Sequence, residues 1–302
     1  MTGTLAVDVG QTGFRLRIAD GEVIRSPIGV DALTSDSQVR SLAARIVDHV
    51  PAGASFIDVG IGLSGYVEGS PAPAALAADI QDRLKARSTI VAADAVTAFL
   101  GTIGPRPGTV AICGTGVAAL SVGVEGPARR VDARGYLLGD FGSGFWLGQR
   151  GLQAALDAIE GRGEATVLAH SSTRLGRPED IYHDAMSSTP APKYIAGFAP
   201  DVLDAADDGD AVAQRILQEA ADHLALTIRT ARISDSAIGL TGGLTRSATY
   251  VTSVRSALKR LGLRTTDLTI EADAALDGAR IIAENPHIRS AFVGLIAVKE
   301  SQ

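Results

Sequence analysis

Two stretches of the chain repeat the same order of elements: an apolar strand, a short polar turn between glycines, and a returning strand. The first stretch is residues 5–19, in which Gly10-Gln11-Thr12-Gly13 separates the strands. The second is residues 109–124, in which Gly114-Thr115-Gly116 is the turn. Glycines let the backbone fold tightly and bring N–H groups close to an anion. The repeat indicates an internal duplication, so each half of the chain is expected to begin with such a hairpin.

The first hairpin carries an inventory that suits a nucleotide with magnesium. Gln11 and Thr12 offer neutral hydrogen-bond donors, and Asp8 offers a carboxylate oxygen for a hard cation. An ordinary hairpin, whose glycines serve only the turn, explains this stretch equally well. Other parts of the chain must decide between the two interpretations.

Length and charge narrow the class of protein. The 302 residues exceed what one compact core usually holds, so two domains are expected. A net charge of -6 argues against a nucleic-acid surface, which relies on clustered Lys and Arg. One cysteine, Cys113, cannot form an internal disulfide, and Asp8 stands where a secretory signal would be apolar. No apolar run is long enough to span a bilayer, so we predict a cytoplasmic protein without membrane or nucleic-acid partners.

The order of predicted elements is that of an α/β protein. Strands alternate with helices through the first hundred or so residues, and in such sheets the chemistry collects at the carboxyl ends of strands. Asp94 stands at the end of the strand predicted at residues 89–93. The Pro/Gly cluster at residues 104–108 marks a boundary between domains of residues 1–107 and 108–302. The second domain should carry a helical insertion at about residues 160–235, and its last helix, at residues 290–299, could dock back on the first domain.

Several familiar motifs can be set aside. Residues 60–65, Gly-Ile-Gly-Leu-Ser-Gly, match the dinucleotide-binding fingerprint, but a loop with Pro71 and Pro73 follows where that motif needs a helix. A substrate loop is the better interpretation of these residues. The chain has no Gly-Lys pair for a Walker-type phosphate loop and no Gly-x-Ser-x-Gly elbow. Five scattered histidines with one cysteine give no zinc spacing.

A third glycine turn, Gly242-Gly243, follows another predicted strand, at residues 237–240. With its three turns the chain resembles the actin-like ATPase superfamily over nearly its whole length. The resemblance implies two actin-like (ribonuclease H-like) α/β domains with ATP and substrate in the cleft between them. It implies ATP contacts in three groups: Gly10, Gln11 and Thr12; Gly114, Thr115 and Gly116; Gly242 and Gly243. It also implies Mg²⁺ near Asp8, held through water.

A sharper resemblance lies in residues 135–148 (Gly-Tyr-Leu-Leu-Gly-Asp-Phe-Gly-Ser-Gly-Phe-Trp-Leu-Gly), together with Leu63-Ser64-Gly65 and Ala93-Asp94-Ala95. These segments are similar to the N-acetylglucosamine kinase branch of the BadF/BadG/BcrA/BcrD-type ATPase family. The resemblance implies that Asp94 is the general base for phosphoryl transfer. It also implies that the sugar is contacted by Ser64, Gly65, Asp94, Gly135 and Asp140.

Residue chemistry leaves simpler roles open for the same positions. Asp94 could cap the helix that follows it, Asp140 could form a loop turn, and Ser64 could be a turn residue. Phosphoryl transfer nevertheless needs mainly positioning and charge neutralisation, and a carboxylate near the acceptor hydroxyl can take its proton. Asp94 suits that role.

The resemblance implies ATP-dependent phosphorylation of an amino sugar, and we expect N-acetylglucosamine to be modified at its 6-hydroxyl. Two departures from the family pattern lie near the expected sugar pocket: Ala133-Arg134-Gly135 replaces a frequent Gly-Trp-Gly, and Phe141 replaces a frequent Glu. Glucosamine therefore remains an alternative substrate, and a homodimer remains open.

Three other classes within the same fold fit less well. An ATP-driven electron activator needs cysteine ligands for an iron–sulfur cluster, and Cys113 alone cannot supply them. A filament or chaperone-type switch ATPase would have no sugar loop such as residues 139–143. ROK sugar kinases commonly carry a cysteine cluster for zinc and a Glu-x-Gly-His motif, and neither is present in the sequence.

Overall fold

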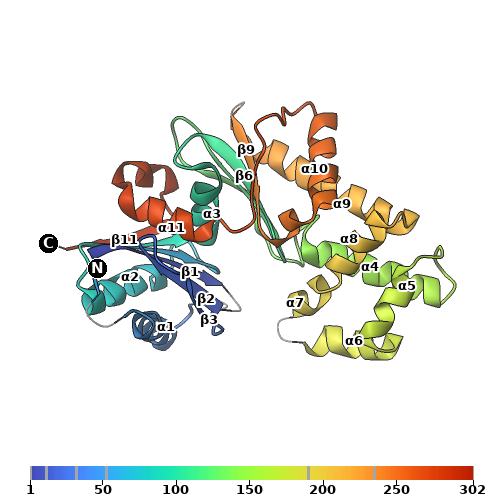
Figure 1. Cartoon of the computed structure of the whole chain (residues 1–302), viewed down its shortest axis with the longest axis horizontal. Helices are drawn as coiled ribbons and strands as arrows, with labels where there is room; N and C mark the ends of the chain where they lie inside the picture. The colour runs from blue at the N-terminus through green and yellow to red at the C-terminus, as the bar shows by residue number, and fades with distance from the viewer. Residues whose placement is uncertain are drawn as a thin grey trace. The chain divides into compact units, whose positions relative to one another are not determined.

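The computed structural model describes residues 2–10, 13–30, 33–51, 54–188, 191–233 and 236–301. These residues form two compact units, each built around its own sheet (Figure 1). Unit 1 contains the described residues of 1–108, 122–128 and 273–302, and unit 2 contains those of 109–121 and 129–272. Unit 1 is therefore completed by a segment that follows unit 2 in the chain.

The sheet of unit 1 has the strand order β11-β5-β4-β1-β2-β3. Its strands are β1 (Thr2–Gly10), β2 (Gly13–Ile18), β3 (Ile24–Ser26), β4 (Ser55–Leu63), β5 (Ser88–Ala93) and β11 (Ile296–Glu300). Its helices are α1 (Asp36–Asp48), α2 (Ala72–Leu84), α3 (Asp94–Ile103) and α11 (Ala275–Glu284), followed by a 3₁₀ helix (Pro286–Phe292). β1, β4 and β5 are parallel to one another.

Helices cover both faces of this sheet, which is the layered arrangement that the alternating elements predict (Figure 1). The period of two along β1 sends its side chains to opposite faces. Leu5 and Val7 join the apolar cluster with α1 and α2, whereas Ala6 packs with Leu276 and Ala279 of α11. Both faces of β1 are thus buried, and the strand is correspondingly apolar.

Gly60 and Gly62 of the fingerprint-like stretch serve helix packing. A Cβ atom on Gly60 would lie 1.8 Å from the carbonyl oxygen of Ala279 in α11. A Cβ atom on Gly62 would lie 2.6 Å from Oγ1 of Thr97 in α3, and one on Gly278 would lie 1.7 Å from the carbonyl oxygen of Thr97. Only glycine permits these approaches, so the fingerprint-like spacing brings α3 and α11 onto β4.

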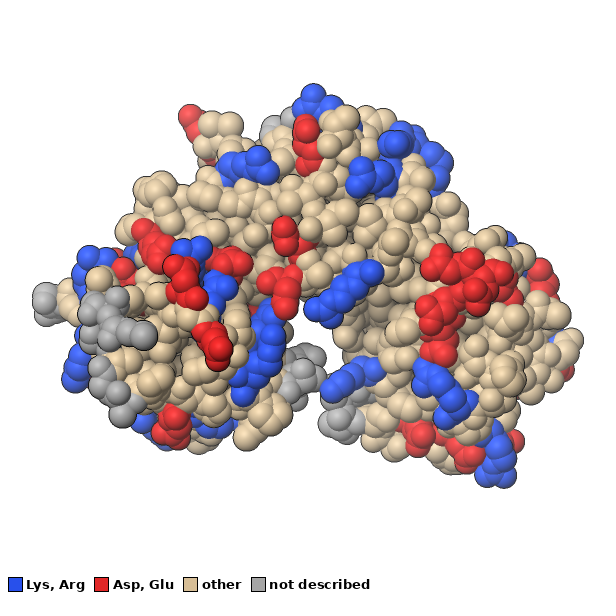
Figure 2. Space-filling view, in the orientation of Figure 1, with Lys and Arg blue, Asp and Glu red and all other residues tan. Residues whose placement is uncertain are grey.

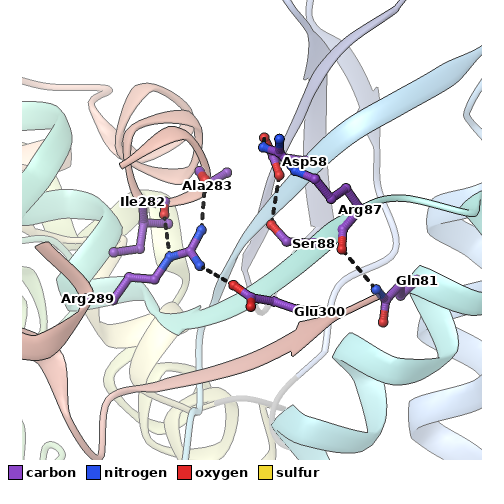
Figure 3. Close-up of polar contacts among 8 residues, drawn as sticks. All are labelled: Asp58, Gln81, Arg87, Ser88, Ile282, Ala283, Arg289 and Glu300. Carbon is purple, nitrogen blue, oxygen red and sulfur yellow. Dashed lines mark hydrogen bonds and ion pairs between the residues drawn. The ribbon is translucent and has the colours of Figure 1, made fainter. Parts of the chain in front are cut away.

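The prediction of a helix at residues 290–299 is wrong, because a 3₁₀ helix and a strand occupy this segment. The 3₁₀ helix ends at Phe292, Gly294 has a φ of 82°, and β11 then runs antiparallel to β5 as an edge strand. Arg289 ties this segment together (Figure 3), because its guanidinium donates to the carbonyl oxygens of Ile282 and Ala283 and pairs with Glu300 of β11 at 3.1 Å. Hydrogen bonding to a distant strand outweighs the weak local preference for helix.

The sheet of unit 2 has the strand order β10-β9-β6-β7-β8. Its strands are β6 (Gly108–Cys113), β7 (Val117–Val122), β8 (Arg129–Asp132), β9 (Ala237–Thr241) and β10 (Thr269–Glu271). Its helices are α4 (Gly144–Ile159), α5 (Leu168–Ser171), α6 (Pro178–Ser187), α7 (Ala191–Ala196), α8 (Ala199–Asp207), α9 (Ala211–Ala231) and α10 (Ala248–Arg260). Short 3₁₀ helices lie at Ser172–Leu175 and Gly243–Arg246.

The core of unit 2 gathers around α9. Its buried stripe at helical spacing, which includes Val212, Ile216, Ala220, Leu224 and Ile228, forms one cluster with residues of β6, β9, α4, α8 and α10. Asp210 caps this helix by accepting a hydrogen bond from the backbone N–H of Ala213 at 2.9 Å. The long periodic stretch is therefore a core helix, as its pattern predicts.

Three glycines of α4 let two helices and one turn approach it closely. A Cβ atom on Gly148 would lie 1.9 Å from the carbonyl oxygen of Ile195 in α7. A Cβ atom on Gly151 would lie 2.3 Å from Cγ2 of Val202 in α8. Gly144, at the start of the helix, would place a Cβ 3.0 Å from the carbonyl oxygen of Gly114. Gly148 and Gly151 set how closely α7 and α8 pack on α4.

Within the described residues, no helix combines the length and apolar character required to cross a membrane.

Candidate functional site

Unit 1 brings three predicted site residues to one edge of its sheet. Val9 of β1 is paired with Leu63 of β4, and Leu63 is paired in turn with Ala93 of β5. The residues that end or directly follow these strands are Gly10, Ser64 and Asp94. Since neighbouring strands lie about 4.8 Å apart, these three positions fall within about 10 Å along one edge. A predicted phosphate contact, sugar contact and base are thus neighbours.

Ser64 is fixed to the first hairpin through the backbone. Its N–H donates to the carbonyl oxygen of Val9 at 2.9 Å, which extends the β1–β4 pairing by one residue beyond the strand. Gly65 follows with a φ of 72°, so the chain turns away in the left-handed region that favours glycine. Gly10 accepts a hydrogen bond from the N–H of Val30 at 3.0 Å. Gln11 and Thr12, also predicted as ATP contacts, lie outside the described residues.

Asp94 is the first residue of α3, and its side chain is exposed. The N-cap position itself belongs to Ala93, which makes no side-chain cap bond. The backbone carbonyl of Asp94 accepts a hydrogen bond from the Thr97 hydroxyl at 3.0 Å. A carboxylate at this end of a helix is stabilised by the helix dipole. The position therefore suits a charged group that faces solvent or a ligand.

Asp8 lies opposite Arg15 in the β1–β2 hairpin, and Nε of Arg15 is 2.9 Å from Oδ2 of Asp8. Arg15 also forms an ion pair with Asp273. Burial raises the pKa of Asp8 above its ordinary value, although Arg15 opposes this shift. Asp8 is thus oriented by a cation next to the first glycine turn.

Asp8 fits the way in which magnesium is commonly held in nucleotide sites. Among the residues that the structure describes, no group of three or more His, Cys, Asp or Glu side chains could hold a metal ion. Mg²⁺ is usually bound through one or two carboxylates together with water and substrate phosphates. Asp8 can supply one such carboxylate, so its donor chemistry is compatible with magnesium that arrives with a nucleotide.

Unit 2 joins the second phosphate turn to the predicted sugar loop. Within the turn, the N–H of Gly114 donates to the carbonyl oxygen of Gly116 at 3.0 Å. Asp140 is buried against it: Oδ1 accepts from the N–H of Val117 at 2.9 Å, and a Cβ on Gly116 would lie 2.8 Å from that oxygen. Burial raises the pKa of Asp140, the Val117 N–H opposes this shift, and nearby Asp132 adds to it. A predicted sugar contact is thus also a support of the phosphate turn.

The loop that presents Asp140 is held by a second aspartate. Oδ1 of Asp132 accepts from the N–H of Asp140 at 3.0 Å, and a Cβ on Gly139 would lie 2.2 Å from the same oxygen. Gly135 has a φ of 72°, and its carbonyl accepts from the N–H of Gly139 at 2.9 Å. Ala133, where the family often has glycine, adopts a φ of 59°. The loop therefore contains several residues in the left-handed region, including Asp140 at 59°.

The N-terminus of α4 supports the phosphate turn and does not present its N–H groups to a ligand. The N–H groups of Gly144 and Phe145 donate to the carbonyl oxygens of Gly114 and Thr115 at 2.8 and 3.0 Å. The N–H of Trp146 donates to the N-cap hydroxyl of Ser143 at 3.1 Å. Donors that could have met a phosphate are used within the protein.

The third glycine turn packs directly against the end of β6, next to the second glycine turn. Gly242 has a φ of 101°, and a Cβ there would lie 2.6 Å from the carbonyl oxygen of Cys113, which ends β6. Gly243 begins the 3₁₀ helix that follows. Gly114, Thr115 and Gly243 all line one pocket of about 740 Å³. The structure therefore places Gly114 and Thr115, predicted to contact the phosphates, in the same pocket as Gly243, predicted to contact the nucleoside.

The other walls of this pocket have no sequence motif. They come from the ends of α7 and α10, from the 3₁₀ helix that contributes Arg246, and from one side of α8, which contributes Asp204 and Asp207. On the face seen in Figure 2, acidic side chains gather on unit 2. Carboxylates repel phosphates but accept hydrogen bonds from ribose hydroxyls, so this wall suits the nucleoside end of ATP. The volume lies within the range of small-molecule sites.

A second pocket, of about 690 Å³, is lined in part by the predicted sugar loop. Its walls include Tyr136, Phe141, Trp146 and Arg150. Phe141 is half exposed, and its ring centroid lies 5.3 Å from that of His223. With Arg134, Phe141 also lines a smaller pocket of about 200 Å³. The two departures from the family pattern therefore share a surface.

Comparison with known proteins agrees with this geometry. An N-acetylmuramic acid/N-acetylglucosamine kinase of Clostridium acetobutylicum is 36% identical over 143 residues, which are 46% of this chain and 47% of that protein. An N-acetyl-D-glucosamine kinase of Dictyostelium discoideum is 35% identical over 136 residues, 43% of each chain. The matches thus span less than half the length of these relatives.

Solved structures match over almost the whole chain. A protein assigned as an N-acetylglucosamine kinase from Chromobacterium violaceum has a TM-score of 0.70 and 25% identity, covering 92% of this chain and 98% of that one. A ROK family glucokinase from Streptomyces griseus, solved with glucose and AMPPNP, shares the fold with a TM-score of 0.59 and 19% identity, covering 93% and 99%. The predicted actin-like kinase fold is confirmed.

The sequence model of the BadF/BadG/BcrA/BcrD ATPase family matches residues 5–280, which include both hairpins, the loop of residues 135–148 and the third glycine turn. The chain therefore belongs to the BadF/BadG/BcrA/BcrD ATPase family.

Proposed function

We propose that this protein is an ATP-dependent sugar kinase that phosphorylates N-acetylglucosamine at the 6-hydroxyl, with Asp94 as general base. The observation that carries the proposal is the row of Gly10, Ser64 and Asp94 on adjacent strand ends of unit 1. The nucleotide-sized pocket beside Thr115 and Gly243 in unit 2 adds a place for ATP. The relatives named as kinases of N-acetylated sugars supply the substrate class.

Phosphoryl transfer requires no covalent intermediate with the protein, which mainly positions the reactants and neutralises charge. The carboxylate of Asp94 accepts the proton of the 6-hydroxyl while that oxygen attacks the γ-phosphorus, and the bond to the bridging oxygen of ADP breaks. The glycine turns after β1 and β6 hold the phosphates through backbone N–H groups other than that of Gly114, which donates to Gly116. Bound magnesium would neutralise phosphate charge, with Asp8 oriented by Arg15 as its protein ligand through water.

The sugar contacts in this proposal are Ser64 and Gly65 from unit 1 and Gly135 and Asp140 from unit 2. We infer N-acetylglucosamine over glucosamine because Phe141 replaces a carboxylate frequent in relatives and Arg134 stands on the same surface. An ammonium group would gain from a nearby carboxylate, whereas Arg134 repels it. A higher kcat/KM for glucosamine would reverse this choice.

N-acetylmuramic acid is a second candidate substrate, favoured by one observation. The aromatic pocket beside the sugar loop contains Arg150, whose guanidinium lies 5.6 Å from the ring centroid of Trp146. An arginine beside aromatic rings can bind the carboxylate of an acidic sugar substituent. If this sugar is a substrate, Arg150→Gln should raise its KM and leave that of N-acetylglucosamine unchanged.

A coupled assay of ADP release over a panel of amino sugars tests the proposal. ADP release that saturates with N-acetylglucosamine and yields the 6-phosphate supports it. Turnover that is independent of every sugar, particularly with nucleotide-dependent assembly, would instead indicate a switch ATPase. Phosphate found on another hydroxyl would contradict the proposed position of transfer.

A further inference from the structure

Tyr250 is a fully buried side chain of unit 2 with a polar end. It lies in the first turn of α10, and its solvent exposure is 0%. Its hydroxyl donates to the carbonyl oxygen of Gly142 at 3.1 Å, and its side chain belongs to the same buried cluster as that of Cys113. A buried hydroxyl costs free energy unless it is hydrogen-bonded, so this hydrogen bond is needed where the tyrosine stands.

Gly142, which accepts from the hydroxyl, and Cys113, which lies in the same buried cluster, belong to different parts of the site. Cys113 ends β6 and directly precedes the phosphate turn that starts at Gly114. Gly142 stands two residues after Asp140, in the predicted sugar loop. The tyrosine's own helix begins beside Ser247, which lines the nucleotide pocket and caps α10 through the N–H of Tyr250 at 3.2 Å. One phenol thus contacts or adjoins the nucleotide turn, the sugar loop and the nucleoside wall.

The segment around Gly142, to which Tyr250 donates, is also constrained by its backbone conformation and by other close contacts. Gly142 has a φ of 83°, and a Cβ there would lie 2.4 Å from the carbonyl oxygen of Ala220 in α9. The N–H of Ser143 donates to the carbonyl oxygen of Asp140 at 3.1 Å. A shift of the Gly142 carbonyl would therefore be transmitted to Asp140 and to its bond with the phosphate turn.

We propose that Tyr250 is a positioning residue whose hydroxyl holds the sugar loop in register with the phosphate turn, so that binding of nucleotide and binding of sugar favour each other. The aromatic ring fills the core, a task that phenylalanine would perform equally well. The hydroxyl adds the hydrogen bond that ties Gly142 to a side chain packed in one cluster with the end of β6. The sugar part of this inference rests on the proposed function, whereas its effect on the phosphate turn does not.

Tyr250→Phe tests the connection because it keeps the ring and removes only the hydroxyl. The measurement is the Kd of a non-hydrolysable ATP analogue with and without saturating N-acetylglucosamine. Favourable coupling between ligands typically changes affinity by about 5-fold or more, and we expect such a ratio in the wild type. In Tyr250→Phe the ratio should fall towards 1, with a weaker Kd for the analogue alone and a higher KM for both substrates.

Thr109→Val is the matched control. Thr109 is fully buried in β6 of the same unit and shares a 2.9 Å hydrogen bond with the buried hydroxyl of Ser121. It lies at the opposite end of the strand from Cys113. This variant should lose thermal stability as Tyr250→Phe does, because each removes a buried hydrogen bond, yet keep the wild-type affinity ratio.

Several outcomes would overturn the inference. It fails if the wild type shows no coupling, if Tyr250→Phe keeps the wild-type ratio, or if Thr109→Val loses it equally. Should Tyr250→Phe not fold, Cys113→Ala removes the contact with β6 and must also lower the ratio. If no sugar is phosphorylated at all, the proposed function fails, but the analogue's Kd alone still decides whether the hydroxyl positions the phosphate turn.

Discussion

The backbone N–H of Val117 donates a 2.9 Å hydrogen bond to Oδ1 of Asp140. Val117 is the first residue of β7, directly after the second glycine turn, and Asp140 belongs to the loop that the family resemblance assigns to the sugar. The Asp140 carboxylate therefore supports the second glycine turn and also belongs to the predicted sugar loop. For this reason a change at Asp140 should affect stability and catalysis in different ways.

Replacement of Asp140 by Asn should separate these two effects. Burial raises the pKa of Asp140, so the folded protein binds its proton more tightly than the unfolded chain does, and the ionised form costs stability above the folded pKa. Asn keeps an oxygen for Val117 and tolerates the left-handed backbone. The variant should therefore be at least as stable as the wild type at neutral pH but phosphorylate sugar more slowly.

The pH dependence supplies the check. The stability advantage of Asp140→Asn should shrink as pH falls towards the usual aspartate pKa, because the wild-type carboxyl then becomes neutral. Urea unfolding at several pH values measures it. The opposite result would be a variant that loses stability relative to wild type at neutral pH but not at acid pH. It would show that the ionised carboxylate stabilises the fold.

Asp94→Asn should abolish most of the activity without loss of the fold. General-base contributions are typically about 10²- to 10⁴-fold in rate, which corresponds to roughly 3 to 5 kcal/mol of barrier. The measurement is kcat at saturating ATP and sugar, together with the melting temperature and ATP affinity. Asp36→Asn is a matched control, since Asp36 is likewise an exposed first residue of a helix.

The control should keep wild-type kinetics. If folded, ATP-binding Asp94→Asn retains more than about a tenth of wild-type kcat, its loss falls short of the low end expected of a general base, and the assignment is wrong.

Ala133→Gly should stabilise the protein. Ala133 has a φ of 59°, and a left-handed conformation costs an L-residue roughly 1 to 2 kcal/mol, partly offset by the greater unfolded-state freedom of glycine. We expect a net gain of roughly 0.5 to 1 kcal/mol, measured by chemical unfolding. Ala128→Gly, at a position outside the left-handed region, should instead lose stability; equal effects at both positions would contradict the strain argument.

Gly148→Ala should distort the pocket of about 740 Å³ by displacing α7, which forms part of its wall. The added methyl group would lie 1.9 Å from the carbonyl oxygen of Ile195, so α7 must move away from α4. Overpacking of this kind costs typically about 1 to 3 kcal/mol. Since Ala196 at the end of α7 lines the pocket, KM for ATP should rise as well. Gln153→Ala, on an exposed position of the same helix, should change neither quantity.

Some of the site could be predicted from the sequence because its signals are local. A glycine turn after an apolar strand carries its own conformational reason. In the structure Gly10 ends a strand, and Gly114 and Gly242 each directly follow one. The parallel order of β1, β4 and β5 then places Ser64 and Asp94 at the same edge. These positions follow from the general rule for strand ends in α/β sheets.

Other parts depend on contacts between distant segments and leave no local signal. β11 is a strand because β5 offers an unpaired edge, not because residues 296–300 are strongly β-forming. Asp204 of α8 lines the pocket of about 740 Å³ only because Gly148 and Gly151 let the helices approach α4. The bond from Val117 to Asp140 requires a left-handed aspartate, which no pattern in the sequence indicates.

The return of residues 273–301 to unit 1 sets an order of events during synthesis. α11 packs against β4 at Gly60 and against α3 through Gly278, yet it leaves the ribosome after all of unit 2. Until α11 has been synthesised, one face of β4 and the side of α3 that packs on α11 remain unpacked. Contacts of such long sequence separation form slowly, and unit 2, whose segments are complete earlier, can fold first. The nascent chain should therefore form the pocket that we propose for ATP before the helix that carries the proposed base is fully packed.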